Sequence, residues 1–156
     1  MIDIDFRVSP SWRARVDGES LATADEMAIS YDVFLGDILF KVNGLDFSGR
    51  WDWIPLIDFA SSLRRIVDEL SADDHAVSIF EFTESDATLR FERDADSVII
   101  SAGYAIGSAR VALAEFGEAV DGFLRRMIET IAQQYPALLR NRLLSRYLPV
   151  LPMDRL

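Results

Sequence analysis

Apolar and polar residues alternate along the first forty-odd residues of the chain, which is the pattern of strands with one buried face. Pro10 separates the first two of these strands, and Gly36-Asp37 is a usable two-residue hairpin turn between the last two. Asn43-Gly44 is a second strong turn signal, and it ends the series. We therefore expect four strands in this part of the chain, at residues 2–8, 12–16, 27–34 and 38–43.

The period of the pattern changes at Asp52. Apolar residues recur at spacings of three and four from Leu56 to Leu70, which predicts a helix of about 18 residues with one buried face. Asp52 is a candidate N-cap for this helix, and Pro55 is tolerable in its first turn.

A second group of strands follows this helix. Polar turns at Glu84-Ser85-Asp86 and at Asp94-Ala95-Asp96 separate short alternating stretches. Strands joined by such short turns pair most simply as antiparallel neighbours. The sequence therefore predicts a four-stranded meander at residues 76–83, 87–93, 97–104 and 109–113.

The last third of the chain, residues 114–148, is predicted to be helical. Apolar residues at helical spacing run from Phe116 to Tyr135, Pro136 ends that helix, and residues 137–147 predict a short third helix. Strands grouped in this way between helices favour an α+β fold over alternating βαβ units. We expect one domain over residues 1–156, with an antiparallel sheet of about eight strands and helices on one face.

Charge and composition narrow the classes of function. The 156 residues carry 26 acidic and 16 basic side chains, a net charge of −10, and the chain has no cysteine. Residues 1–99 hold 21 acids and 9 bases, a net −12, whereas residues 100–156 hold 5 and 7, a net +2. An acidic protein is repelled by nucleic acid and by anionic membranes, and without cysteine it forms no disulfide. With no secretory signal pattern at Met1, we expect a cytoplasmic protein that binds neither nucleic acid nor membrane.

The sequence contains few residues placed for catalysis. His75 is the single histidine, and dyads, triads and most zinc sites need a histidine with a partner. No phosphate-binding glycine loop and no nucleophile elbow is present. We therefore expect no catalytic residue, no metal and no cofactor.

Acidic residues of the predicted meander are the first candidate for a binding surface. If its hairpins hold them together, they form a negative surface that attracts a cationic protein and speeds its association. The candidate contacts are Glu81, Glu84, Asp86, Glu92, Asp94 and Asp96.

Two alternatives concern other parts of the chain. Arg50, Trp51 and Trp53 form a dense cluster that could stack against a planar ligand, which would make the protein a small-ligand binder or an enzyme; the same run also fits the start of a helix. The leucine-rich segment from Pro136 to the end of the chain must be covered, either by its own sheet or by a second copy in a homodimer.

Three stretches of the sequence carry a family resemblance. They are the helix beginning Trp53-Ile-Pro-Leu-Ile-Asp-Phe-Ala, the hairpin Phe80-x-Phe-Thr-Glu-Ser-Asp86 and the strand at Leu89-x-Phe91. With these motifs the chain resembles uncharacterised small acidic α+β proteins of high-GC bacteria, and it is more loosely similar to polymorphic-toxin immunity proteins. The resemblance implies an inhibitor that covers a basic toxin, and it assigns no residue a role.

Overall fold

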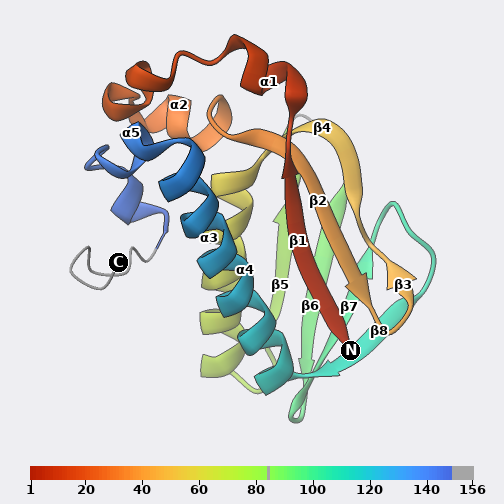
Figure 1. The fold of residues 1–156 in the computed structure, drawn as a ribbon. Coiled ribbons are helices and arrows are strands. Elements are labelled where there is room, and N and C mark those ends of the chain that lie inside the picture. The colour runs from red at the N-terminus through yellow and green to blue at the C-terminus, as the bar shows by residue number, and fades with distance from the viewer. Residues whose placement is uncertain (84, 149–156) are drawn as a thin grey trace.

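The computed structural model describes residues 1–83 and 85–148, and its strands form two antiparallel sheets of four strands each (Figure 1). The predicted α+β class and the total of eight strands are confirmed. The predicted single sheet is divided in two, because helix α3 leads the chain away from β4 and the next strand, β5, begins a new sheet. We call the two sheets A and B.

Sheet A is built around β2, which pairs with β1 along one edge and with both β3 and β4 along the other. Asn43 and Gly44 have positive φ angles of 49° and 87° and form the tight turn between β2 and β3, as predicted. The strands of sheet A are β1 (Ile2–Val8), β2 (Leu35–Val42), β3 (Leu45–Asp46) and β4 (Gly49–Pro55).

Sheet B is the predicted meander, with its strands in sequence order. The turn at residues 94–96 is confirmed by the pairing of Asp94 with Ser97. One face of the sheet is buried in the core and the other is open, as the alternating burial of its residues shows. The strands are β5 (Val77–Glu81), β6 (Thr88–Asp94), β7 (Ser97–Ala102) and β8 (Ser108–Ala112).

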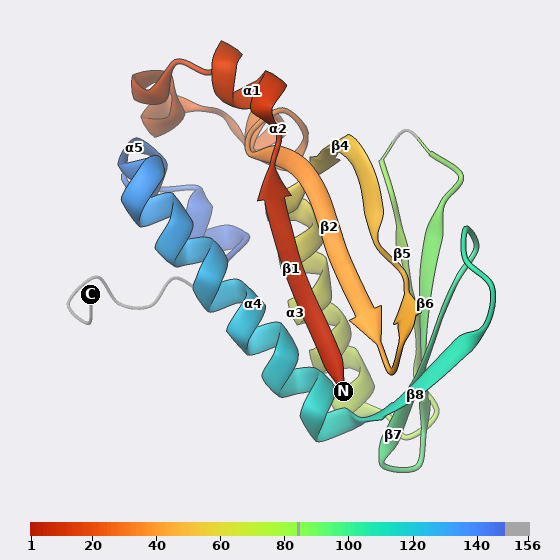
Figure 2. The ribbon, with the colours of Figure 1, turned by 45° about the vertical axis from the view of Figure 1, so that its right-hand side comes forward.

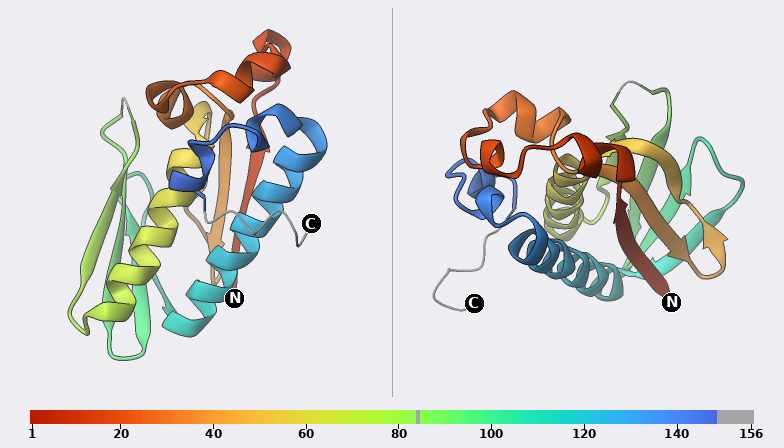
Figure 3. Two further views of the ribbon diagram at one scale, coloured as in Figure 1. Left: turned by 90° about the vertical axis from the view of Figure 1, so that its left-hand side faces the viewer. Right: turned by 45° about the horizontal axis from the view of Figure 1, so that its top comes forward.

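Two long helices, α3 (Leu56–Ala72) and α4 (Leu113–Gln134), lie side by side along the inner faces of the sheets (Figures 1 and 3). α3 packs against strands of both sheets, and α4 follows the free edge of β1 (Figure 2). Phe59 of α3 lies at the centre of the core, with its ring 5.1 Å from that of Phe80 and 5.9 Å from that of Phe123. The prediction of these two helices is confirmed.

Two predicted strands near the N-terminus are helices. Residues 12–16 belong mostly to α1 (Pro10–Arg15), and residues 27–34 belong mostly to α2 (Glu26–Tyr31). Each helix is stabilised by an N-cap residue. The Ser9 hydroxyl accepts a hydrogen bond from the backbone N–H of Trp12, and the Asp25 carboxylate accepts one from the backbone N–H of Ala28. Between them lies a short 3₁₀ helix, η1 (Gly18–Thr23).

The predicted turn at Gly36-Asp37 is wrong, because both residues lie within β2. The predicted helix start at Asp52 is also wrong, since residues 49–55 form β4 and helix α3 begins at Leu56. Strand β4 was identifiable from the alternation of Arg50 and Asp52 with the two tryptophans, which is a strand period and not a helix start.

The C-terminal segment packs onto its own chain. The predicted helix at 137–147 is broken into α5 (Pro136–Leu139) and a 3₁₀ turn, η2 (Leu144–Arg146). Buried Asn141 joins this segment to the region around η1, because its side-chain amide donates to the carbonyl oxygens of Leu21 (2.9 Å) and Ala24 (2.8 Å). Its leucines at 138, 144 and 148 are buried within the chain, so they are not available to the expected homodimer interface. Val150 and Leu151 lie outside the described residues.

Candidate functional site

The predicted acidic surface on sheet B is not one patch. Glu81 and Asp86 flank the β5–β6 loop, whereas Asp94 and Asp96 flank the β6–β7 turn at the opposite end of β6. Glu84 lies outside the described residues. The two hairpins therefore do not present their carboxylates together.

Two of these acids are already paired with arginine. Glu92 lies 2.8 Å from Arg90, and Asp94 lies 2.7 Å from Arg110. Both pairs are exposed to solvent, where an ion pair offsets charge without adding much stability. Of the predicted surface, Glu81 and Asp86 remain together at one end of the sheet.

Arg50 is separated from the two tryptophans. Its guanidinium pairs with Asp46 at 3.3 Å, and it lines a shallow hollow of sheet A together with Asp3 and Lys41. Hydrogen bonds from Ser48 and the nearby Arg50 charge lower the pKa of Asp46, so this pair is ionised at neutral pH. Arg50 is therefore engaged elsewhere and does not join Trp51 and Trp53 in one platform.

Trp51 and Trp53 stack on one another, with ring centres 5.8 Å apart and planes at 18°. Trp51 is fixed in turn by edge-on contacts with Phe82 (5.0 Å) and Tyr104 (5.2 Å). The Tyr104 hydroxyl donates to the carbonyl oxygen of Phe47 (2.6 Å), and burial raises the pKa of this phenol, so it stays a donor at neutral pH. Trp53 is thus the exposed end of a row of packed aromatic rings.

The indole of Trp53 forms one wall of a groove of about 550 Å³ between α2, β4 and the β5–β6 loop. Met27 and Tyr31 of α2 also line this groove, and Asp32 lies at the end of that helix. Side chains of this size are usually covered, yet Met27 is 69% exposed, Tyr31 47% and Trp53 38%. The groove is completed by Leu35, Pro55 and Thr83.

Helix α2 is held in place from its other side. Ile29 is the one residue of the helix that is fully buried. The Ser30 hydroxyl donates to the hydroxyl oxygen of Tyr147 (3.0 Å), which in turn donates to the carbonyl oxygen of Glu26 (3.3 Å). The C-terminal segment therefore fixes the helix that exposes Met27 and Tyr31.

Strand β4 is fixed by an irregularity between the two tryptophans. Asp52 has a positive φ of 67°, and its N–H donates to a carboxylate oxygen of buried Asp37 at 2.8 Å. The pairing of β2 with β4 shifts register between Gly36 and Ile38, as at a β-bulge. Bulges re-aim side chains, and here the re-aimed segment leads directly to Trp53.

The helix that lines the groove, α2, belongs to an acidic part of the chain. Residues 16–40 contain no lysine and no arginine, and they carry six acids: Asp17, Glu19, Asp25, Glu26, Asp32 and Asp37. Asp32 forms no ion pair with a base in residues 1–83 or 85–148. This gap in the basic residues was readable from the sequence, but the alternating apolar residues there predicted a buried strand instead.

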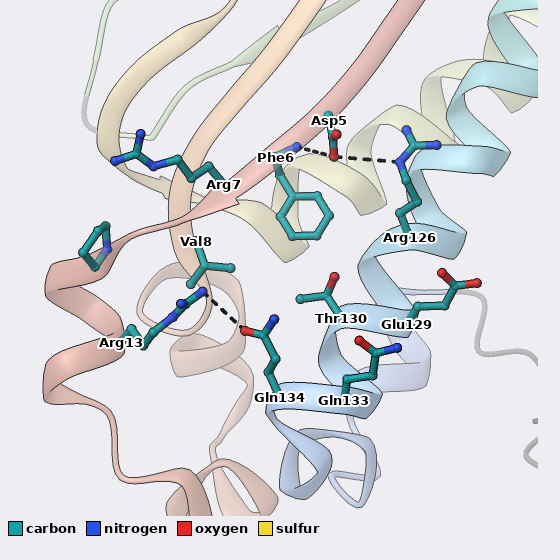
Figure 4. Close-up of a pocket in the computed structure, with 11 residues that line it drawn as sticks. Asp5, Phe6, Arg7, Val8, Arg13, Arg126, Glu129, Thr130, Gln133 and Gln134 are labelled. Carbon is teal, nitrogen blue, oxygen red and sulfur yellow. Dashed lines mark hydrogen bonds and ion pairs between the residues drawn. The ribbon is translucent and has the colours of Figure 1, made fainter.

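A second hollow, of about 490 Å³, lies between β1 and α4 (Figure 4). Two of its three basic groups are engaged: Arg126 lies 3.8 Å from Asp5, and Arg13 donates to Gln134 (3.3 Å) and to the Tyr135 hydroxyl (3.2 Å). Arg7 points away from α4. These contacts join α4 to β1 through Arg126 and to α1 through Arg13.

The described residues show no metal-binding group of three or more His, Cys, Asp or Glu side chains. His75 is exposed in the turn between α3 and β5, where its backbone N–H donates to Asp73. In the same part of the chain, no helix is long and apolar enough to cross a bilayer.

Comparison with protein-family models, with curated proteins and with solved structures found no match to this chain. The groove is therefore interpreted from its own residues and contacts.

Proposed function

We propose that this chain is a non-catalytic protein-binding module whose partner is a cationic protein. The observation that carries the proposal is the groove lined by the exposed side chains of Met27, Tyr31 and Trp53. Met27 and Tyr31 belong to a stretch of 25 residues with six acids and no base. Aromatic residues and methionine are enriched in protein interfaces, and tryptophan and tyrosine contribute many of the strongest single contacts. The surrounding negative charge favours a basic partner and raises the rate of encounter.

The fixed position of the groove walls supports this function. Trp53 is stacked on an anchored neighbour, and α2 is tied to Tyr147. A surface that is already ordered loses less conformational entropy on binding, so more of the contact energy appears as affinity. Glu81 and Asp86, at the β5–β6 loop that contributes Thr83, extend the acidic surface beside the groove.

The most specific form of the proposal is an inhibitor of the immunity type, which covers the surface of a basic toxin. It follows the resemblance of the helix and hairpin motifs together with the acidic groove. In this form the groove and the two acids of the β5–β6 loop meet the basic surface of the toxin.

The test is affinity capture from a lysate of the source organism, with bound proteins quantified by mass spectrometry at low and high salt. The double variant Glu26→Lys/Asp32→Lys reverses two charges at the two ends of α2, the second of them in the lining of the groove. Glu118→Lys/Asp121→Lys makes the same change on the exposed face of α4 and is the matched control.

We expect a basic protein that is retained at low salt, released at high salt, captured by the control and lost from the groove variant. Equal capture by both variants, or a bound protein that is not basic, would contradict the proposal. Purified partner and chain then give the affinity directly.

A further inference from the structure

We propose that the groove binds an arginine side chain of the partner, held between the aromatic walls with its guanidinium at Asp32. This inference rests on the proposed function and names the group that the groove recognises. It starts from the composition of the walls, which combine two aromatic rings, an apolar lining and one carboxylate.

Arginine matches each part of this lining. Its aliphatic stem packs on apolar surface, here Leu35 and Pro55, while the charged head stays near water. Its planar guanidinium stacks on the faces of tryptophan and tyrosine, and arginine makes this contact more often than lysine does. A carboxylate accepts two parallel N–H bonds from the same group.

Asp32 is the acceptor that the chain leaves available. It ends α2 as the C-cap, where its backbone N–H donates to the carbonyl oxygen of Ala28. Its side chain is exposed and lines the groove. No lysine or arginine in the described residues lies within ion-pair distance of it. An arginine from outside supplies the missing counter-charge.

Charge also selects against a purely apolar occupant. Asp32 lines the groove and Glu26 is exposed on the same helix, so both add negative potential there. Two other acids of residues 16–40 contribute less, because Glu19 pairs with Arg140 at 3.3 Å and Asp37 is buried. An apolar side chain would cover the rings but would leave Asp32 without a partner in a less hydrated setting, which is unfavourable. A cationic group with a flat, weakly hydrated head satisfies both requirements.

The test uses the full chain and two peptides of equal charge, acetylated hexa-arginine and acetylated hexalysine, in calorimetric titrations at low salt. The groove variants are Trp53→Leu, Tyr31→Leu and Asp32→Asn, and Asp121→Asn on α4 is the control for loss of one acid. Tyr31→Leu lies on an exposed face, so it tests the aromatic wall even if Trp53→Leu disturbs β4. Circular dichroism confirms that each variant is folded.

We expect hexa-arginine to bind more tightly than hexalysine, and each groove variant to weaken it by about tenfold while the control keeps the wild-type affinity. If the folded groove variants bind hexa-arginine with the wild-type affinity, the arginine site is overturned. The peptide then binds to acidic residues elsewhere on the surface. Equal affinity for the two peptides would overturn the preference for guanidinium. No binding of either peptide would overturn this site and the proposed cationic partner together.

Discussion

At Gly36 the backbones of β1 and β2 approach too closely for a side chain. A methyl group at this position would lie 1.9 Å from the carbonyl oxygen of Arg7. The glycine therefore serves a close approach inside a strand, whereas the sequence predicted a turn there.

We expect Gly36→Ala to lower the free energy of unfolding by roughly 2–4 kcal/mol, because strand backbone must move to relieve the clash. Urea denaturation followed by circular dichroism measures the loss. Gly18→Ala is the matched control, since a methyl group there meets no atom within 4 Å. A Gly36→Ala variant as stable as Gly18→Ala would contradict the close approach.

Asp58, in the first turn of α3, makes stability depend on pH. Burial raises the pKa of its carboxyl, and the attraction of Arg65 opposes this only in part. The folded state therefore keeps a proton at pH values where the unfolded chain has lost it. The contribution of Asp58 to the free energy of unfolding therefore falls as the pH rises from the pKa of its carboxyl in the unfolded chain, about 3.9, through its higher pKa in the folded protein.

The Asp58→Asn variant removes this titration. We expect its free energy of unfolding to fall less than that of the wild type as the pH rises through that window, measured by urea midpoints between pH 4 and 7. Asp68→Asn removes the same charge from an exposed position of α3. Its free energy of unfolding should fall between pH 4 and 7 by as much as that of the wild type. Parallel pH profiles for wild type and Asp58→Asn would rule out the buried carboxyl as the cause.

Among the elements, β1 has a free edge that α4 protects (Figure 2). Arg126 donates to the carbonyl oxygen of Ile4 and pairs with Asp5, so this edge is partly satisfied by a side chain. Exposed strand edges invite pairing with other chains, and covering them is a common protection.

We expect Arg126→Ala to lower the free energy of unfolding by about 1–2 kcal/mol, since a charged hydrogen bond to a backbone carbonyl is lost. Arg125→Ala removes an exposed arginine next to it on α4 and should be close to neutral. Chemical denaturation compares the two variants, and light scattering reports any association through the uncovered edge. Equal stability of the two variants would show that the contact contributes nothing.

Elements with a long period or strong turns were predictable from the sequence. The meander and the helices α3 and α4 repeat their pattern over enough residues to be distinguished. Helices α1 and α2 have six residues each, which is too short for a helical period to appear. The capping residues Ser9 and Asp25 mark the starts of these two helices, whereas the alternation of apolar residues wrongly indicated strands.

The groove escaped prediction for a related reason. The alternation of apolar and polar residues at 27–34 predicted a strand with Met27 and Tyr31 on its buried face, because large apolar residues are usually covered. In the structure they are exposed on α2 and line a groove with Trp53, which is distant in sequence. Trp53 was identified as a candidate, but its partners across the groove follow from tertiary packing that no local pattern records.

At the scale of the whole molecule, the two sheets share one core. Phe40 of sheet A lies 6.3 Å from Phe91 of sheet B, and Phe59 of α3 contacts Phe80 of sheet B and Phe123 of α4. Elements that share a buried core lose their packing contacts together when the chain unfolds.

We therefore expect one cooperative unfolding transition, as predicted for a single domain. Tryptophan fluorescence follows the unfolding of α1 and β4, where the three tryptophans lie. Far-UV circular dichroism follows the average of all the helices and both sheets. Urea curves from the two signals should superimpose. Two separated midpoints would show that the chain does not unfold in one cooperative step.

The bond between Ser30 and Tyr147 has a consequence for the order in which the protein is made. The two residues are 117 positions apart, so a ribosome completes α2 long before it adds the tyrosine that fixes that helix. Asn141, which closes on Ala24, is likewise added late. A nascent chain that has not reached Tyr147 therefore lacks the contacts that hold Met27 and Tyr31 in place, and we expect the groove to become ordered only after this residue is added.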